Sequence, residues 1–236
     1  INLNDESSQI HKINGVSTGI FLETIADKIR ESIPEPSEAE MKILLNTAAN
    51  LCYAAGLTAV TDAGINKNEV LRLNEMQQNG KLAMHIDVWL NPNEENINYF
   101  VKQDIKLSNR ALRVKAIKLY ADGALGSRGA CLKMPYSDAS GNVGIQVTSS
   151  AELEKICKIA YTYGYQVNTH AIGDSAVGLV LRTYSKFLKP GNDRRWRVEH
   201  AQVVDPNDIS LFGKFNIIPS IQTTHATSDM PWAKLR

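Results

Sequence analysis

The chain has 236 residues, of which 43% are hydrophobic and 22% charged, and its formal net charge is +1. This balance is typical of a folded protein, predicted here as a single domain over residues 1–236, and gives no electrostatic reason to expect nucleic acid or an anionic membrane as a partner. No apolar run approaches the roughly 20 residues of a membrane span. The three cysteines are too few and too widely spaced for a disulfide framework, which favours a reducing compartment, the cytoplasm.

Two helices and one strand are predicted in the first quarter of the chain. Residues 1–14 are polar and irregular, and apolar residues then recur at helical spacing over Thr18–Ile33. Ser37 is a good N-cap for a long amphipathic helix that ends at Gly56. Leu57–Thr61 follows as a buried strand.

Strands and helices alternate through the rest of the chain. Asp62-Ala63-Gly64 is predicted as a turn, and Ala121–Thr148 as a long Gly-rich connection of the kind that serves as a binding loop. Helices are predicted near Glu69–Gln78, Glu94–Lys102 and Ala151–Tyr163, after an N-cap at Asp174, and after Asp205-Pro206. The further strands are predicted at Leu82–Leu90, Val114–Lys118, Gln166–His170, Trp196–His200 and Phe215–Ile221.

Six strands alternating with helices predict an α/β fold with a parallel sheet. A barrel and an open doubly wound sheet both fit this alternation. The barrel is favoured because chemically useful residues end several different strands, whereas an open sheet gathers them at one switch point.

Three strand ends carry an ionisable side chain: Lys118, His170 and His200. Imidazoles that converge from rigid elements are typical ligands of a divalent metal. Each histidine could instead be an ordinary core or loop residue, and Lys118 could simply extend to the barrel mouth. Lys118 could also be a Schiff-base nucleophile of an aldolase or lyase, or a carbamylated lysine that binds metal through oxygen. A metal-free binding or scaffold protein is the remaining alternative.

Three residues near these strand ends are expected to have roles other than metal ligation. Glu199 is expected on the strand face opposite to His200, where a solvated or ion-paired role is more common than ligation. Asp174 is expected to cap a helix or to contact a ligand residue from behind. Cys131 has no paired base in view and is interpreted as an inert thiol.

Four ordered motifs give this sequence a family resemblance. They are Lys118–Arg128 (KLYADGALGSR), Thr169–Asp174 (THAIGD), Val198–Gln202 (VEHAQ) and Ser220–His225 (SIQTTH), the last followed by Ser228–Ala233. Together they resemble the amidohydrolase superfamily, in the branch that includes N-substituted formamide deformylase. The resemblance extends over nearly the whole chain, with Gly15–Gly64 also fitting.

The resemblance implies a metal-dependent (β/α)8 barrel hydrolase of amide or related C–N bonds other than peptide bonds. It implies that Lys118, carbamylated, His170 and His200 bind a divalent metal, with zinc expected. Asp122 and Asp174 would support these ligands from a second layer. A small amide-type substrate would contact residues near the barrel mouth, for which the candidates are Arg128, Tyr136, Gln222 and His225.

Parts of the family pattern are absent from this sequence. No HxH pair precedes Gly15, and the expected catalytic aspartate would follow Arg236. The six strands are therefore expected to be the second to seventh of a partial TIM-type barrel, without the first and eighth strands and without the β-sandwich of relatives. The chain is expected to be an inactive internal fragment that binds metal weakly or not at all, keeps Lys118 unmodified, and forms a homo-oligomer through exposed barrel edges.

Overall fold

A computed structural model describes residues 10–21, 23–105, 107 and 111–236. The chain divides into two compact units, Ile1–Leu44 and Leu45–Arg236. Among the described residues, none of the helices combines the length and apolar character that a membrane crossing requires. The single domain over residues 1–236 stays a prediction.

The first unit contains a β-hairpin. Strand β1 (Ile10–Ile13) pairs antiparallel with β2 (Val16–Phe21), and helix α1 (Glu23–Arg30) follows. The helix predicted over Thr18–Ile33 is therefore wrong in its first part, as is the irregular structure predicted at Ile10–Ile13; residues 1–9 lie outside the described residues. Asn14 and Gly15 both have positive φ, 50° and 78°. An Asn-Gly pair favours a two-residue hairpin turn, and this local signal outweighs the helical spacing.

The second unit is built on one sheet of six parallel strands in the order β3-β4-β5-β6-β7-β8. Their bounds are β3 Ala59–Ile65, β4 His85–Leu90, β5 Leu112–Tyr120, β6 Gln166–Ala171, β7 Arg197–His200 and β8 Ile218–Ser220. Each strand pairs with the next one in the sequence, as in a barrel, whereas a doubly wound sheet reverses its order at a switch point. The predicted fold class, part of a TIM-type barrel, is confirmed.

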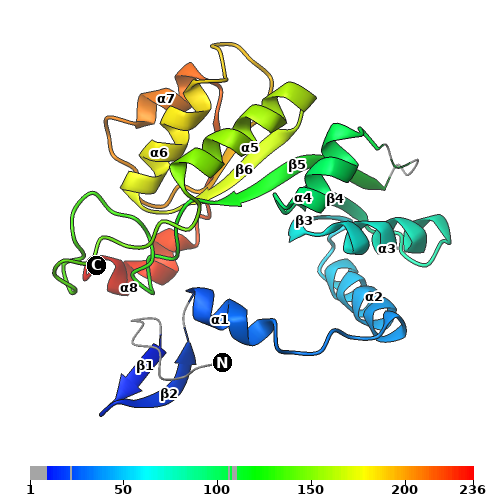
Figure 1. The fold of residues 1–236 in the computed structure, drawn as a ribbon, viewed down its shortest axis with the longest axis horizontal. Helices are drawn as coiled ribbons and strands as arrows, with labels where there is room; N and C mark the ends of the chain where they lie inside the picture. Colours follow the sequence, from blue (N-terminus) through cyan, green and yellow to red (C-terminus); the bar gives the residue numbers. More distant parts are fainter. Residues whose placement is uncertain (1–9, 22, 106, 108–110) are drawn as a thin grey trace. The chain divides into compact units, whose positions relative to one another are not determined.

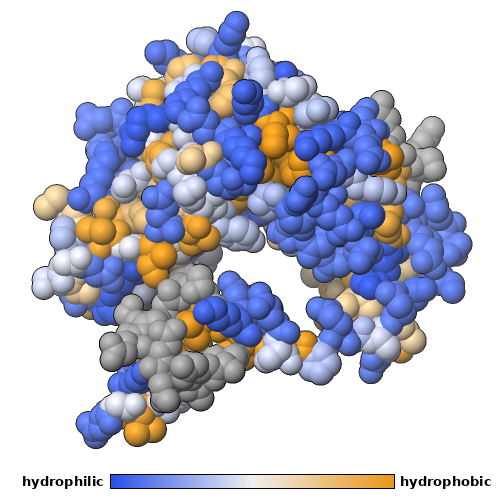
Figure 2. Space-filling model, viewed as in Figure 1, coloured by the Kyte–Doolittle hydropathy of each residue, from blue (hydrophilic) through white to orange (hydrophobic). Residues whose placement is uncertain are grey.

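Helices connect these strands and lie beside the sheet, as α5 and α6 do next to β6 (Figure 1). The connecting helices are α3 Lys67–Gln78, α4 Glu94–Asn96, the π-helix η1 Ile97–Lys102, α5 Ser150–Tyr163, α6 Asp174–Ser185 and α7 Ile209–Lys214. Helix α2 (Glu38–Ala54) precedes β3, and the π-helix η2 (His225–Asp229) and α8 (Met230–Ala233) follow β8. The exposed side of α3 is mostly hydrophilic (Figure 2). The predicted ends of α5 are confirmed: Ser149 accepts a hydrogen bond from the Glu152 amide, and Gly164 is left-handed.

Three predicted boundaries are wrong. Asp62-Ala63-Gly64 is not a turn, because β3 continues in register with β4 through Ile65 and only shifts at a bulge near Gly64. Asp205 does not start a helix; its carboxylate accepts from the Asn207 amide in a turn, and α7 begins at Ile209. Asp174 is the first residue of α6, whose N-cap is Gly173.

The two faces of β5, β6 and β7 differ in character. Ile117, Val167 and Val198 are completely buried within the main hydrophobic cluster, where Trp196 and Tyr184 also lie. The alternate positions carry Lys118, Asn168, His170, Arg197 and Glu199, which define what we call the inner face. The candidate site lies on the inner face and at the strand ends beside it.

Candidate functional site

Strand register fixes two rows of side chains across the inner face. Lys118 pairs with Asn168, and Asn168 pairs with Arg197. In the next row toward the carboxyl ends, Tyr120 pairs with His170, and His170 pairs with Glu199. Lys118 and His170 thus come from neighbouring strands in neighbouring rows.

His170 and His200 meet at the ends of β6 and β7. Their ring centroids lie 4.6 Å apart at an interplanar angle of 68°. Regular alternation would place His200 on the face opposite to Glu199 and His170. His200, however, has φ +74° and Ala201 has φ +41°. This left-handed backbone breaks the alternation and allows the imidazole of His200 to reach that of His170.

Hydrogen bonds orient both rings. Nδ1 of His200 lies 2.9 Å from Oε1 of Gln222, and because a carbonyl oxygen only accepts, Nδ1 carries the proton. Nε2 of His170 lies 3.4 Å from the Gly123 carbonyl and 3.5 Å from Oδ1 of Asp122, which are also acceptors. The described residues provide no hydrogen-bond partner for Nδ1 of His170 or Nε2 of His200. Each neutral ring therefore keeps one lone pair free.

The environment keeps both imidazoles neutral. Burial, the neighbouring His200 and the charge of Lys118 lower the pKa of His170 to about 4. Burial also lowers the pKa of His200, and Lys118 and His225 add to this effect while Gln222 and Glu199 oppose it. Neutral imidazole is the form that binds a metal.

Lys118 is 95% buried, since only 5% of the residue is exposed. Its ammonium donates to the Leu119 carbonyl at 3.2 Å and lies 3.9 Å from the centroid of the Tyr120 ring. Burial lowers the pKa of Lys118 to about 8, although the charge of Glu199 opposes this shift. Its charge acts on both histidines. The structure thus brings the three predicted ligands together, and their role as ligands stays a prediction.

Asp122 connects the site to the long connection after β5. Its buried carboxylate accepts from the backbone amides of Cys131, Ile172 and Gly173 at 2.8–3.0 Å. These bonds fix the loop after β6 directly behind His170. The predicted supporting role of Asp122 toward a metal ligand stays a prediction.

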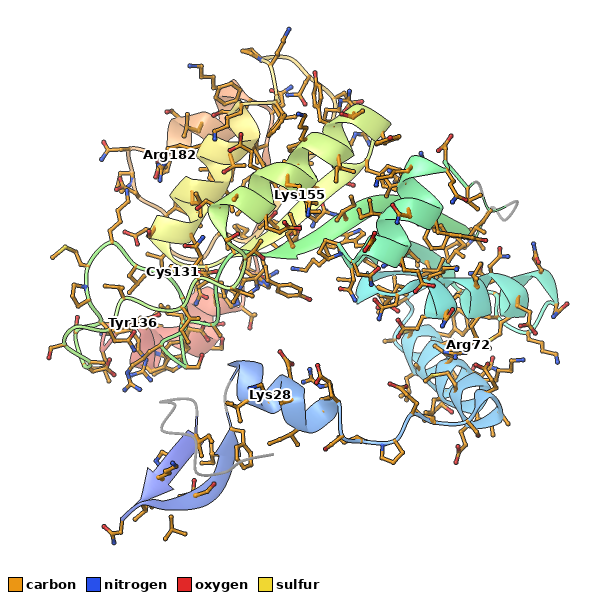
Figure 3. The ribbon with its side chains drawn as sticks, viewed as in Figure 1. Lys28, Arg72, Cys131, Tyr136, Lys155 and Arg182 are labelled. Carbon is orange, nitrogen blue, oxygen red and sulfur yellow. The ribbon has the colours of Figure 1, made fainter. Side chains whose placement is uncertain are left out.

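Arg128 and Tyr136 have partners inside the connection (Figure 3 labels Tyr136 and Cys131). Arg128 forms a two-pronged ion pair with Asp138, at 3.0 and 2.8 Å. Tyr136 is 1% exposed and donates to the Ala130 carbonyl at 2.8 Å. Both side chains stabilise the connection in this structure, and their contact with substrate stays a prediction.

The other predicted site residues lie at different distances from the histidines. Gln222 binds His200 directly, and the His225 ring lies 6.2 Å from it. Asp174 contacts neither histidine by a hydrogen bond among the described residues; its Oδ1 accepts from the backbone amides of Lys133 and Ser175. Asp174 therefore fastens the connection to the start of α6.

Sequence reasoning missed two features of the inner face. Arg197 forms a two-pronged ion pair with the buried Glu199, at 2.6 and 3.2 Å, and also donates to the Ser220 hydroxyl. Asn168 is completely buried, and neither atom of its amide has a partner among the described residues. Counting back two residues from His170 and from Glu199 would have placed both on the face of the site.

The chemistry of the donor set fits a divalent metal in part. Two neutral imidazoles with free lone pairs converge beside a buried lysine. Among the described residues, no group of three or more His, Cys, Asp and Glu side chains could hold an ion. Lys118 is the candidate for a third ligand beside the two rings, but its ammonium has no lone pair until it loses a proton or is modified.

Sequential parallel strands with a histidine pair at their ends define a barrel-type protein with a candidate metal centre. The chain belongs to the amidohydrolase family, whose model matches residues 7–236. It is 30% identical to the protein YtcJ of Bacillus subtilis over 93% of this chain and 42% of that protein. It is 27% identical to the protein LONG AFTER FAR-RED 3 of Arabidopsis thaliana over 92% of this chain and 39% of that one.

Two further comparisons concern hydrolases. An uncharacterized metal-dependent hydrolase from Pyrococcus furiosus has 27% identity and a TM-score of 0.81, over 99% of this chain and 48% of that one. The N-substituted formamide deformylase of Arthrobacter pascens is 24% identical over 82% of this chain and 37% of that protein. The chain thus spans less than half the length of these relatives.

Proposed function

We propose that this chain is part of a metal-dependent hydrolase that cleaves amide or related C–N bonds other than peptide bonds. The observation that carries the proposal is the pair of neutral imidazoles, His170 and His200, whose free nitrogens are left beside Lys118. Family membership and the likeness to a metal-dependent hydrolase support the same class. N-substituted formamides are the substrates we would test first, on the basis of the distant deformylase relative.

His170, His200 and Lys118 would hold the metal, which we propose to be zinc. A bound divalent ion polarises a carbonyl group and lowers the pKa of water to about 7. Lys118 would contribute an oxygen ligand as a carbamate. Gln222 and Asp122 would keep the two rings in the tautomers that present Nε2 of His200 and Nδ1 of His170.

The remaining candidates have roles around this centre. His225, beside His200, and Arg128 and Tyr136 in the connection would contact a small-molecule substrate. We propose the cytoplasm as the location of the protein, which its three free cysteines support.

A metal-binding experiment tests the centre. In a form of the protein that extends this chain at both ends, we expect His170→Asn and His200→Asn each to weaken zinc binding by at least about tenfold, which is the effect of losing even a residue behind a ligand, measured with a competing chelator dye. His85→Asn is the matched control, because His85 lies at the opposite end of a strand of the same sheet. Equal zinc affinity in all three variants and in the unmodified chain would contradict the proposed centre.

An activity experiment tests the reaction. Release of formate from an N-substituted formamide is measured with this chain and with a longer form that extends it at both ends. We expect activity in the longer form and its loss in His170→Asn; inactivity of the present chain alone also stays a prediction. Covalent trapping on Lys118 by borohydride and a carbonyl substrate would instead favour a Schiff-base lyase.

A further inference from the structure

Asn168 lies in the middle of the inner face as an unpartnered amide. The residue has 0% exposure, and neither Oδ1 nor Nδ2 has a hydrogen-bond partner among the described residues. A buried amide without hydrogen-bond partners destabilises the folded protein relative to the same amide in water. A side chain of this kind points to a group that the protein acquires after it folds.

The two neighbours of Asn168 on the inner face indicate which side chain could provide the missing hydrogen-bond partner. Arg197, on one side, already donates to Glu199 and Ser220. Lys118, on the other side, is the residue directly paired with Asn168 across β5 and β6. The two side chains leave neighbouring strands at the same level of the inner face. Of the two neighbours, Lys118 is the one whose terminal group can change chemically.

The hydrogen-bonding needs of the Asn168 amide are met differently by the ammonium and the carbamate forms of Lys118. An ammonium offers only donors, so it could pair with Oδ1 but would leave Nδ2 without an acceptor. A carbamate, –NH–COO⁻, presents an N–H donor and an oxygen acceptor side by side. This pattern complements the carbonyl and NH2 of a primary amide, and would satisfy both atoms of Asn168 at once.

We propose that Asn168 is the positioning residue for a carbamate on Lys118, and that it stabilises this carbamate without metal. The inference rests on the proposed function, in which Lys118 is carbamylated. The unprotonated Nζ would attack dissolved CO2, so that one C–N bond forms, one C=O electron pair moves to oxygen, and one proton leaves to solvent. Arg197 offsets the charge of Glu199, which would otherwise repel the new carboxylate.

The sequence predicts that Lys118 stays unmodified without a metal, because a metal ion stabilises the negative charge of a carbamate. A buried amide with a free donor is a second source of stabilisation, since charge-assisted hydrogen bonds are about twice as strong as neutral ones.

The test is carbon-13 NMR of the metal-free chain, prepared with a chelator and titrated with 13C-bicarbonate as the source of CO2. We expect a carbamate signal in the unmodified chain that disappears in Lys118→Arg. Asn168→Asp keeps the size of the side chain but replaces the donor with an acceptor, and Asn168→Leu removes both polar atoms. We expect each to raise the half-saturating bicarbonate concentration about tenfold or more, the effect of one lost charge-assisted bond.

Thr169→Val is the matched control, because Thr169 lies next to Asn168 but faces Tyr184 on the opposite side of the sheet. It should titrate like the unmodified chain. Circular dichroism checks folding, and the leucine variant should fold because it removes an unpaired buried amide. Equal titration of the Asn168 variants and the control would overturn the inference.

The outcome also separates this inference from the proposed function. A carbamate that forms only after zinc is added would overturn the role of Asn168 and leave the proposed metal centre intact. A metal-free carbamate that depends on Asn168, in a chain whose histidines do not bind zinc, would support the inference and contradict the metal centre.

Discussion

The completely buried hydroxyl of Tyr184 lies within hydrogen-bond distance of three oxygen atoms. Its oxygen lies 2.6 Å from Oγ1 of Thr169 and also reaches the carbonyls of Val167 and Arg197, at 3.3 and 3.1 Å. One hydroxyl thus connects α6 to the outer side of β6 and β7. Burial raises its pKa well above the ordinary value, so it stays protonated and able to donate.

We expect Tyr184→Phe to lower the free energy of unfolding by about 1–3 kcal/mol, because buried acceptors lose their donor. Tyr163→Phe is the control, since Tyr163 is 42% exposed at the end of α5 and should change stability by less than about 0.5 kcal/mol. Urea denaturation measures both. A neutral Tyr184→Phe would show that the hydroxyl does not stabilise this junction.

Asp138 provides a pH-dependent prediction. Its hydrogen bond with Arg128, together with the charges of Arg128 and Arg236, lowers its pKa below the ordinary 3.8. Its stabilising effect is therefore present above the unfolded pKa and lost as the pH falls through the lower folded pKa. We expect Arg128→Leu to raise the pKa of Asp138 toward 3.8. An NMR titration of the Asp138 carboxyl group measures this pKa. Asp205, whose partner is Lys133, is the internal control and should not shift.

At the scale of elements, the connection between β5 and α5 is fastened across the start of α6. The Cys131 carbonyl accepts from the Ser175 and Ala176 amides, while Asp174 accepts from the Lys133 amide. Lys133 also forms an ion pair with Asp205. These contacts require the connection to pass very close to Gly173.

We expect Gly173→Ala to destabilise the protein by about 1–3 kcal/mol, as overpacking does elsewhere. A Cβ at Gly173 would lie 2.0 Å from the Cys131 carbonyl oxygen, so the connection would have to move. Gly213→Ala is the control, because nothing lies within 4 Å of its Cβ position and alanine favours the α7 helix. Thermal unfolding compares the two; equal melting temperatures would contradict the close packing.

Elements with local signals were predictable from the sequence, and those decided by pairing were not. Ser149 and Gly164 mark the ends of α5 because capping depends on residues a few positions apart. Gly64 suggested a turn, but pairing with β4 extends β3 past it. The meeting of His170 with His200 was predicted from strand ends, whereas the left-handed backbone that permits it has no sequence signal, since neither His200 nor Ala201 is glycine.

At the scale of the whole molecule, β3 and β8 each have one strand neighbour among the described residues and are the edges of the six-stranded sheet. Parallel strands are normally covered on both sides, and free edges favour association. Ile218 and Ile221, in and next to β8, are 38% and 64% exposed.

We therefore expect the purified chain to self-associate at micromolar concentration, as sedimentation velocity would show. Ile221→Lys should shift the population toward monomer, because a charge on an edge opposes pairing. Met134→Lys, at a 74% exposed position of the connection, should not. A single monomeric species for the unmodified chain would show that these edges do not drive association.

The left-handed pair His200 and Ala201 has a consequence for selection under heat. Such a backbone costs a residue with a side chain roughly 1 kcal/mol more than it costs glycine. A screen for heat resistance should therefore favour Ala201→Gly, which would raise the melting temperature. The same change would also let the backbone leave the left-handed conformation, so the orientation of the His200 ring would be less fixed. The variants selected by heat should therefore bind zinc more weakly. Heat resistance and the fixed orientation of a metal-binding ring would then place opposite demands on residue 201.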